Sequence, residues 1–98
     1  MDEAEIVLRD NIEYVATENI NTLTISMPDV IDEDFRCSID FSSGDTATTF
    51  VYPENFLWTG DNININKQFV PVHNYRYHID IWFDGVYIRA NASGVMIL

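Results

Sequence analysis

Polar and apolar side chains alternate along several stretches of this chain, and this alternation limits its possible folds more than any other feature. Every second residue from Tyr75 to Phe83 is apolar, and the same spacing recurs in residues 22–27 and 35–41. A period of two places one kind of side chain on each face of a β-strand. Further strand candidates are residues 5–9, 12–16, 47–52 and 86–92.

The breaks between these stretches contain turn residues or prolines, which lack a backbone donor. They fall at Pro28, residues 43–45, Pro53, residues 60–61 and Pro71. Only the segment from Pro28 to Asp34 has helical features, because Asp29 could cap a single turn there, and it is too short to organise a fold. We therefore expect an all-β fold, a small antiparallel β-sandwich or barrel of about eight short strands.

The pair Asp84-Gly85 is the strongest local signal, because Asp-Gly between two alternating runs favours a two-residue type I′ hairpin loop. The resulting C-terminal hairpin would pair Ile81 with Ile88 on its inner face. On the outer face it would pair Trp82 with Tyr87, Asp80 with Arg89, and His78 with Asn91. This register brings apolar side chains together and places opposite charges across from each other. Ala90 and Ala92 are small, so we expect a larger side chain to cover them, from Trp58, Phe56 or Phe50.

Length and charge limit the function classes. The chain has 98 residues and a formal net charge of −11 from sixteen acidic and five basic residues. Residues 1–34 hold ten of the acids and one base. We expect one β domain over residues 1–98, with an acidic, assembly-related segment at 1–20 and a β core at 21–98. Phosphate binding needs a basic face, so nucleic acid is not an expected partner.

No apolar run approaches the length of about 20 residues that spans a membrane, and the N-terminus is acidic where a signal peptide is basic. We therefore expect neither a membrane partner nor a secretory leader.

The candidate chemical groups do not form a catalytic or metal-binding set. Asp40 and Asp80 lie mid-strand at outward positions, whereas a glycosidase pair needs two carboxyl groups that converge across a cleft. Cys37 falls on the apolar side of its strand, where a thiol acts as a small hydrophobe. His73 and His78 have no third histidine or cysteine near them in the sequence. We expect no enzyme, no catalytic residue, no cofactor and no metal.

The candidate binding site is a patch on the outer face of the expected hairpin. Trp82 and Tyr87 would be cross-strand neighbours there, surrounded by Arg76, His78, Asp80 and Arg89. Tryptophan, tyrosine and arginine concentrate binding energy at protein interfaces, and aromatic rings also stack on sugars. Alternatively, the acidic N-terminal segment or another subunit covers these rings.

Several turn and core motifs run from Thr22 to Gly94. They include Leu23-Thr24-Ile25-Ser26-Met27 before Pro28, the alternating segment Phe35–Phe41, Ser42-Ser43-Gly44-Asp45, Thr48–Tyr52 before Pro53, Trp58-x-Gly60-Asp61, Phe69-x-Pro71, Tyr75-Arg76-Tyr77-His78, and Trp82-Phe83-Asp84-Gly85-Val86-Tyr87. In these motifs the chain resembles the small β-rich module of virion proteins from tailed bacteriophages, found in tail-fibre, baseplate and head-fibre contexts. The resemblance implies a fold and a setting, and it carries no catalytic residues.

What the resemblance implies is a virion structural protein or domain, present in repeated copies and produced in the cytoplasm of a bacterial host. Its expected partners are further copies of itself and other virion proteins of the tail, baseplate, fibre or capsid. One alternative is a carbohydrate-binding module that recognises a host surface glycan through Trp82, Tyr87 or Trp58. A second alternative is an acidic inhibitor that imitates nucleic acid.

Overall fold

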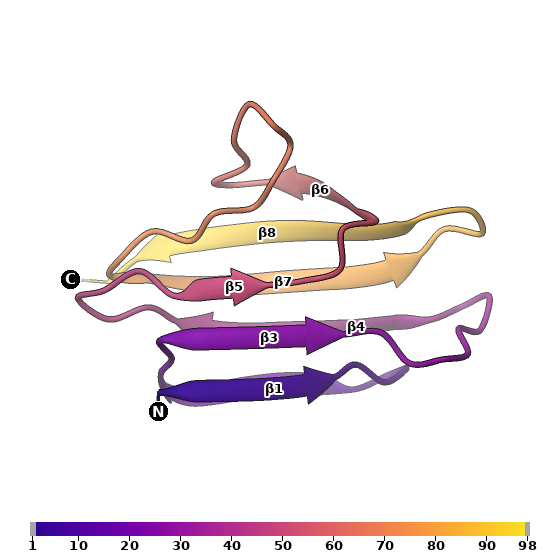
Figure 1. The fold of residues 1–98 in the computed structure, drawn as a ribbon, viewed down its shortest axis with the longest axis horizontal. Helices are drawn as coiled ribbons and strands as arrows, with labels where there is room; N and C mark the ends of the chain where they lie inside the picture. The colour runs from indigo at the N-terminus through magenta and orange to yellow at the C-terminus, as the bar shows by residue number, and fades with distance from the viewer. Residues whose placement is uncertain (1, 98) are drawn as a thin grey trace.

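Residues 2–97, which the computed structural model describes, form eight β-strands in two sheets and contain no helix (Figure 1). The expected all-β fold is therefore confirmed, while the single helical turn considered for Pro28–Asp34 is absent. The strands are β1 (Glu3–Val7), β2 (Glu13–Asn19), β3 (Thr22–Ser26), β4 (Arg36–Ser42), β5 (Thr49–Val51), β6 (Phe56–Gly60), β7 (Tyr75–Phe83) and β8 (Ile88–Met96).

The strands form two layers that face each other across a common core (Figure 1). The three-stranded sheet has the order β1-β3-β5, and the five-stranded sheet has the order β2-β4-β7-β8-β6. From β1 to β6, each strand lies in the opposite sheet from the strand before it. Along the chain, two neighbouring strands of one sheet are therefore connected through a strand of the other sheet. Such neighbours run parallel in β1-β3-β5 and in β2-β4.

The expectation of a purely antiparallel arrangement is wrong for this reason. Among the eight strands of residues 2–97, only the pairs β4-β7 and β7-β8 are antiparallel, and β6 runs parallel to β8. The acidic N-terminal segment, which we expected to lie outside the β core, contributes β1 and β2, one edge strand to each sheet. Leu8, between these two strands, is fully buried.

The core is made by the apolar side chains of the alternating stretches. Phe41, Tyr77, Ile79 and Ile81 are all completely buried between the sheets. Burying one large apolar side chain contributes about 1.5–3 kcal/mol, so these inward positions dominate the stability of the fold. The outward positions of the same strands are left for solvent or a partner.

Strand β6 was not among the strands expected from the sequence. The apolar side chain of Leu57 interrupts the alternation of Phe56 and Trp58 with polar residues. In the structure, β6 pairs with β8, and Trp58 lies opposite Ala90. The indole of Trp58 also stacks on Phe69, with ring centroids 4.9 Å apart. Trp58, one of the side chains expected to cover Ala90 and Ala92, therefore lies beside Ala90 in the same sheet, whereas Ala92 is paired with Gly60. The strand that carries Trp58 was missed.

The antiparallel pairing of β7 with β8 is present, but the expected register is wrong by two residues. Trp82 lies opposite Arg89, and Asp80 lies opposite Asn91. The backbone N–H of Asp84 donates to the carbonyl of Tyr87 (3.0 Å), which leaves Gly85 and Val86 at the tip. The shift preserves the inward and outward faces because it spans two residues.

The carboxylate of Asp84 explains the shifted turn. Its Oδ1 atom accepts the backbone N–H groups of Val86 (2.8 Å) and Tyr87 (2.6 Å). A type I′ loop needs positive φ at both central residues, but of Asp84, Gly85 and Val86 only Gly85 has a positive φ, 98°. Asp84 therefore lies just before the tip, and its side chain stabilises the turn by hydrogen bonds to the backbone, which is a common role of Asp in turns.

Candidate functional site

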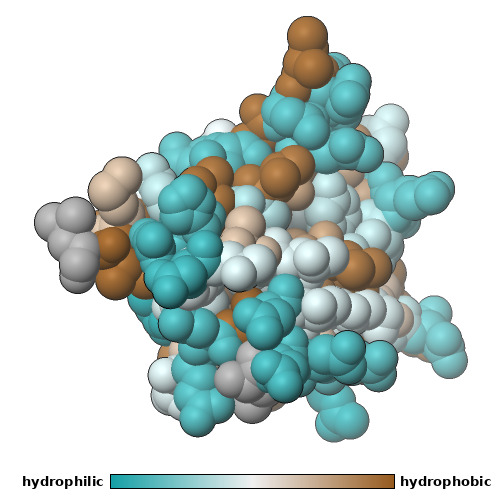
Figure 2. Space-filling view, turned by 60° about the vertical axis from the view of Figure 1, so that its left-hand side comes forward, coloured by the Kyte–Doolittle hydropathy of each residue, from teal (hydrophilic) through white to brown (hydrophobic). Residues whose placement is uncertain are grey.

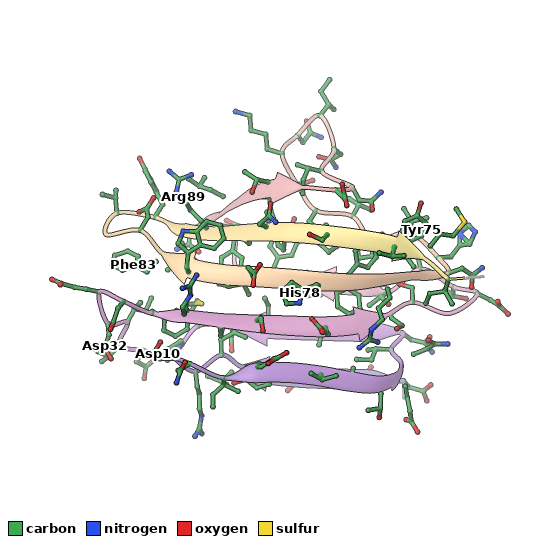
Figure 3. All side chains as sticks on the ribbon, turned by 180° about the vertical axis from the view of Figure 1, so that it is seen from behind. Asp10, Asp32, Tyr75, His78, Phe83 and Arg89 are labelled. Atoms are coloured by element: carbon green, nitrogen blue, oxygen red, sulfur yellow. The ribbon has the colours of Figure 1, made fainter. Side chains whose placement is uncertain are left out.

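The candidate site is the outer surface of the five-stranded sheet along β4, β7 and β8, which we call the outward face (Figure 3). Its residues are the ones that alternate with the buried positions of these strands. They are Arg36, Ser38, Asp40 and Ser42 on β4, Arg76, His78, Asp80 and Trp82 on β7, and Arg89, Asn91, Ser93 and Val95 on β8. Five of the six predicted site residues therefore share one face.

The exception is Tyr87. It lies in the β7–β8 turn, is about half exposed, and is not opposite Trp82 as expected. Asp80 and Arg89 do not face each other either, because the register differs by two residues. The predicted pair of Trp82 and Tyr87 at the centre of the patch is therefore wrong. The residues opposite Trp82 belong to β4 and β8 instead of the turn.

Trp82 lies between two arginines. Its cross-strand partners are Arg36 on β4 and Arg89 on β8. Arg89 is fixed by an ion pair from its Nε atom to the carboxylate of Asp84. This arginine and the backbone N–H groups of the turn lower the pKa of Asp84 from 3.8 to about 2, with the N–H of Tyr87 contributing most.

His78 is held between two carboxylates near the middle of the outward face (Figure 3). Its Nδ1 atom hydrogen-bonds Asp40 on β4, and its Nε2 atom lies 3.0 Å from Asp80 on its own strand. The hydrogen bond with Asp40 is the main cause that raises the pKa of His78 above 6.5. Asp80 adds to the effect, and partial burial opposes it. The protonated imidazolium, with two N–H donors, is the form that satisfies both partners.

Arg76 occupies the other end of the outward face. Its Nη1 atom donates to Ser42 Oγ on β4 (2.7 Å) and to the carbonyl of Ala16 on β2 (3.3 Å). The guanidinium thus connects β7 to the edge strand β2 across β4. Sequence reasoning missed Asp40 and Arg36 as members of the site. Their outward position was visible in the sequence, but the register of β4 against β7 was not.

The chemistry of these groups does not suit nucleophilic catalysis. Both ring nitrogens of His78 are occupied by carboxylates, so neither is free to accept a proton from a hydroxyl group. Cys37 is buried, and burial, followed by the negative charge of Asp10, raises the pKa of its thiol to about 11. Among residues 2–97, no three His, Cys, Asp or Glu side chains are grouped closely enough to hold a metal ion.

A cleft of about 580 Å³ adjoins Trp82 at the end of the sheets. Its polar lining consists of Asp10, Asn11, Asp34 and Arg36, and Phe35, Trp82 and Phe83 supply the apolar surface. The Oδ1 atom of Asp10 accepts the backbone N–H of Arg36 (3.0 Å), which joins the β1–β2 connection to β4. The cleft therefore offers an indole ring beside hydrogen-bond donors and acceptors.

In residues 2–97 there is no helix long and apolar enough to cross a membrane. No family model, curated protein or solved structure matches this chain.

Proposed function

We propose that this protein is a non-enzymatic structural module of a bacteriophage virion, a β-sandwich that assembles with its own copies or with other virion proteins through the outward face. The distribution of charge carries the proposal. Together with Asp84, the outward face holds three of the five basic and three of the sixteen acidic residues. The other thirteen acids and two bases account for the whole net charge of −11.

With His78 counted as neutral, a second copy that approaches this face meets no net charge, while contacts between two acidic parts of the remaining surface are opposed by repulsion. The face also combines a half-buried Trp82 with Arg36 and Arg89, residue types that are enriched in interface hot spots. High negative charge elsewhere would limit non-specific contacts among many copies. The resemblance to tailed-phage modules adds the virion as the setting.

Light scattering coupled to size-exclusion chromatography tests this proposal over a range of protein concentrations. We expect the wild-type protein to form multimers and Trp82→Ala to shift them toward monomer. Val30→Ala is the control, because Val30 is an exposed apolar residue in the β3–β4 connection and not one of the residues of the outward face. A wild-type protein that stays monomeric at the highest concentration would contradict self-assembly.

Carbohydrate binding is a second candidate, favoured by the cleft beside Trp82. Sugar rings stack on indole, and their hydroxyl groups need both donors and acceptors. Arg36 supplies donors there, and Asp34 supplies acceptors. The mixture of both charges suits a neutral polyol better than an ion of either sign.

A panel of neutral oligosaccharides separates the two candidates. Under the second candidate, binding should be lost in Asp34→Asn, a change that lies off the outward face and should leave multimers intact. A panel without any bound sugar would count against carbohydrate recognition and would leave the assembly proposal standing.

A further inference from the structure

A small hairpin in the connection between β6 and β7 projects from one side of the molecule (Figure 1). It spans residues 62–70, and the backbone N–H of Val70 donates to the carbonyl of Asn62 (3.1 Å). Nearer the tip, the backbone N–H of Asn64 donates to the carbonyl of Gln68 (2.9 Å), and Asn64 Oδ1 accepts the N–H of Gln68 (3.0 Å). These bonds define the conformation of the tip.

The tip of this hairpin is apolar. Ile65 is 96% exposed, the largest value among the exposed large hydrophobic residues of the described chain. In Figure 2 the projecting part of the surface has hydrophobic atoms at its summit and hydrophilic atoms around them. Phe69 anchors the base of the hairpin, since it is buried and stacks on Trp58. The fold thus holds one isoleucine away from its own core.

An apolar pocket of about 170 Å³ lies on the opposite side, between the edge strands β1 and β2. These strands belong to different sheets, so no strand closes the core between them. The pocket opens beside the half-buried residues Ala4, Ile6, Tyr14 and Ala16, and its lining includes the buried Leu23. An apolar cavity of about 150 Å³ can hold benzene, so this pocket has room for one isoleucine side chain.

The charges of the two sides are complementary. Glu3 and Glu5 are exposed on β1, the strand that supplies Ala4 and Ile6 to the pocket lining. The hairpin 62–70 contains a single charged residue, Lys67, whose backbone N–H donates to the carbonyl of Asn64 (2.9 Å). Its side chain is exposed and forms no hydrogen bond or ion pair with the described residues. Like charges on two β1 edges also oppose direct pairing of these edges between copies.

We propose that the hairpin of one copy docks on the β1–β2 side of the next copy, with Ile65 inserted in the pocket and Lys67 near the glutamates. The inference rests on the proposed assembly function and names a contact separate from the outward face. The hairpin and the pocket lie on opposite sides of the molecule. One contact therefore leaves the pocket of the first copy and the hairpin of the second copy free to bind further copies. Such a head-to-tail contact builds a ring or a filament rather than a two-fold dimer.

Two complementary variants test this contact by light scattering. Ile65→Asp removes the inserted side chain and keeps the pocket, whereas Ala16→Phe fills the pocket and keeps the hairpin. Each variant alone should need a concentration about tenfold or more above that of the wild type to form multimers. Mixed together in a Trp82→Ala background, which removes the contribution of the outward face, the two should form a 1:1 heterodimer that does not grow, because only one hairpin–pocket contact remains. Val30→Asp adds the same charge at another exposed apolar residue and should assemble like the wild type.

A second pair of variants covers the case in which Ala16→Phe does not fold, which circular dichroism would show. Lys67→Glu should weaken assembly, and adding Glu5→Lys should restore part of it. Wild-type multimers that persist unchanged in Ile65→Asp would overturn this inference but leave the proposed function intact. Folded variants that do not combine in the mixture would also overturn it, and a monomeric wild type would overturn both.

Discussion

His78 on β7 lies directly opposite Asp40 on β4, and its Nδ1 atom is hydrogen-bonded to the Asp40 carboxylate. Asp80 holds the other ring nitrogen, so the folded state favours the protonated imidazole and raises the pKa of His78 above 6.5. A group whose pKa is higher in the folded state stabilises that state most when it is protonated in both states. Stability from His78 is therefore full below about pH 6.5 and declines as the pH rises through the raised pKa.

We predict that His78→Gln lowers the free energy of unfolding most at pH 5 to 6 and progressively less in more alkaline buffer. Urea denaturation of both proteins at several pH values measures the difference. His73→Gln is the matched control, because His73 is exposed and forms no hydrogen bond or ion pair with the described residues. A difference between wild type and His78→Gln that does not change with pH would contradict the two-carboxylate arrangement.

The stability contributed by the Asp84 carboxylate should depend on pH in the opposite direction. Its pKa is lowered from 3.8 to about 2, so the folded state favours the carboxylate. A lowered folded pKa gives stability that is present above the unfolded pKa and lost as the pH falls. We expect Asp84→Asn to be less stable than the wild type above about pH 4, and we expect this difference in stability to disappear as the pH falls from about 4 to 2. Thermal unfolding at pH 2, 3, 4 and 5 measures this, with Asp45→Asn in an exposed loop as the control.

Thr48 joins three chain segments at one end of the core, where both it and Ser43 are buried. Its hydroxyl donates to the carbonyl of Ile20 (2.6 Å), so the 2.8 Å contact with Ser43 must use the Ser43 proton. Thr48→Val keeps the shape and leaves Ser43 and the carbonyl of Ile20 without this partner. We predict a loss of about 1–3 kcal/mol in the free energy of unfolding, measured in urea.

Thr49→Val is the control for that experiment, because it makes the same chemical change at an exposed position of β5. If both variants lose equally little stability, the buried hydroxyl pair does not contribute as we argue.

The sequence was informative wherever one stretch of chain determines the structure. The inward set Tyr77, Ile79 and Ile81 follows from alternation within β7, and its complete burial agrees with that pattern. Contacts between distant segments could not be read in the same way. The pairing of Trp58 with Ala90 joins two separate segments, and the alternation that would have marked β6 is broken at Leu57.

In the candidate site, too, features fixed by one strand were predictable and contacts between strands were not. The outward positions of Asp40 and His78 were predictable from each strand alone, but their contact depends on the register of β4 against β7. At the β7–β8 turn, the Asp-Gly pair indicated the correct location. The register still differed, because the Asp84 side chain accepts two backbone N–H groups and moves the tip to Gly85 and Val86.

Gly60 is the position where a single methyl group should disturb the fold most. It ends β6 beside Ala92 of β8, and a Cβ atom there would lie 2.1 Å from the carbonyl oxygen of Ala92. That oxygen also accepts the backbone N–H of Asp61 (2.8 Å). The φ angle of Gly60 is +103°, a conformation that L-residues rarely adopt. Gly60→Ala therefore combines backbone strain with a clash that only separation of β6 from β8 relieves.

We predict a loss of about 3 kcal/mol or more in the free energy of unfolding for Gly60→Ala. Gly85→Ala is a matched control, because Gly85 has a similar φ of +98° and no atom within 4 Å of the added Cβ. It should show the cost of strain alone, about 1–2 kcal/mol. Equal losses in urea for the two variants would mean that β6 does not approach β8 closely at Ala92, and the parallel pairing that positions Trp58 would then be wrong.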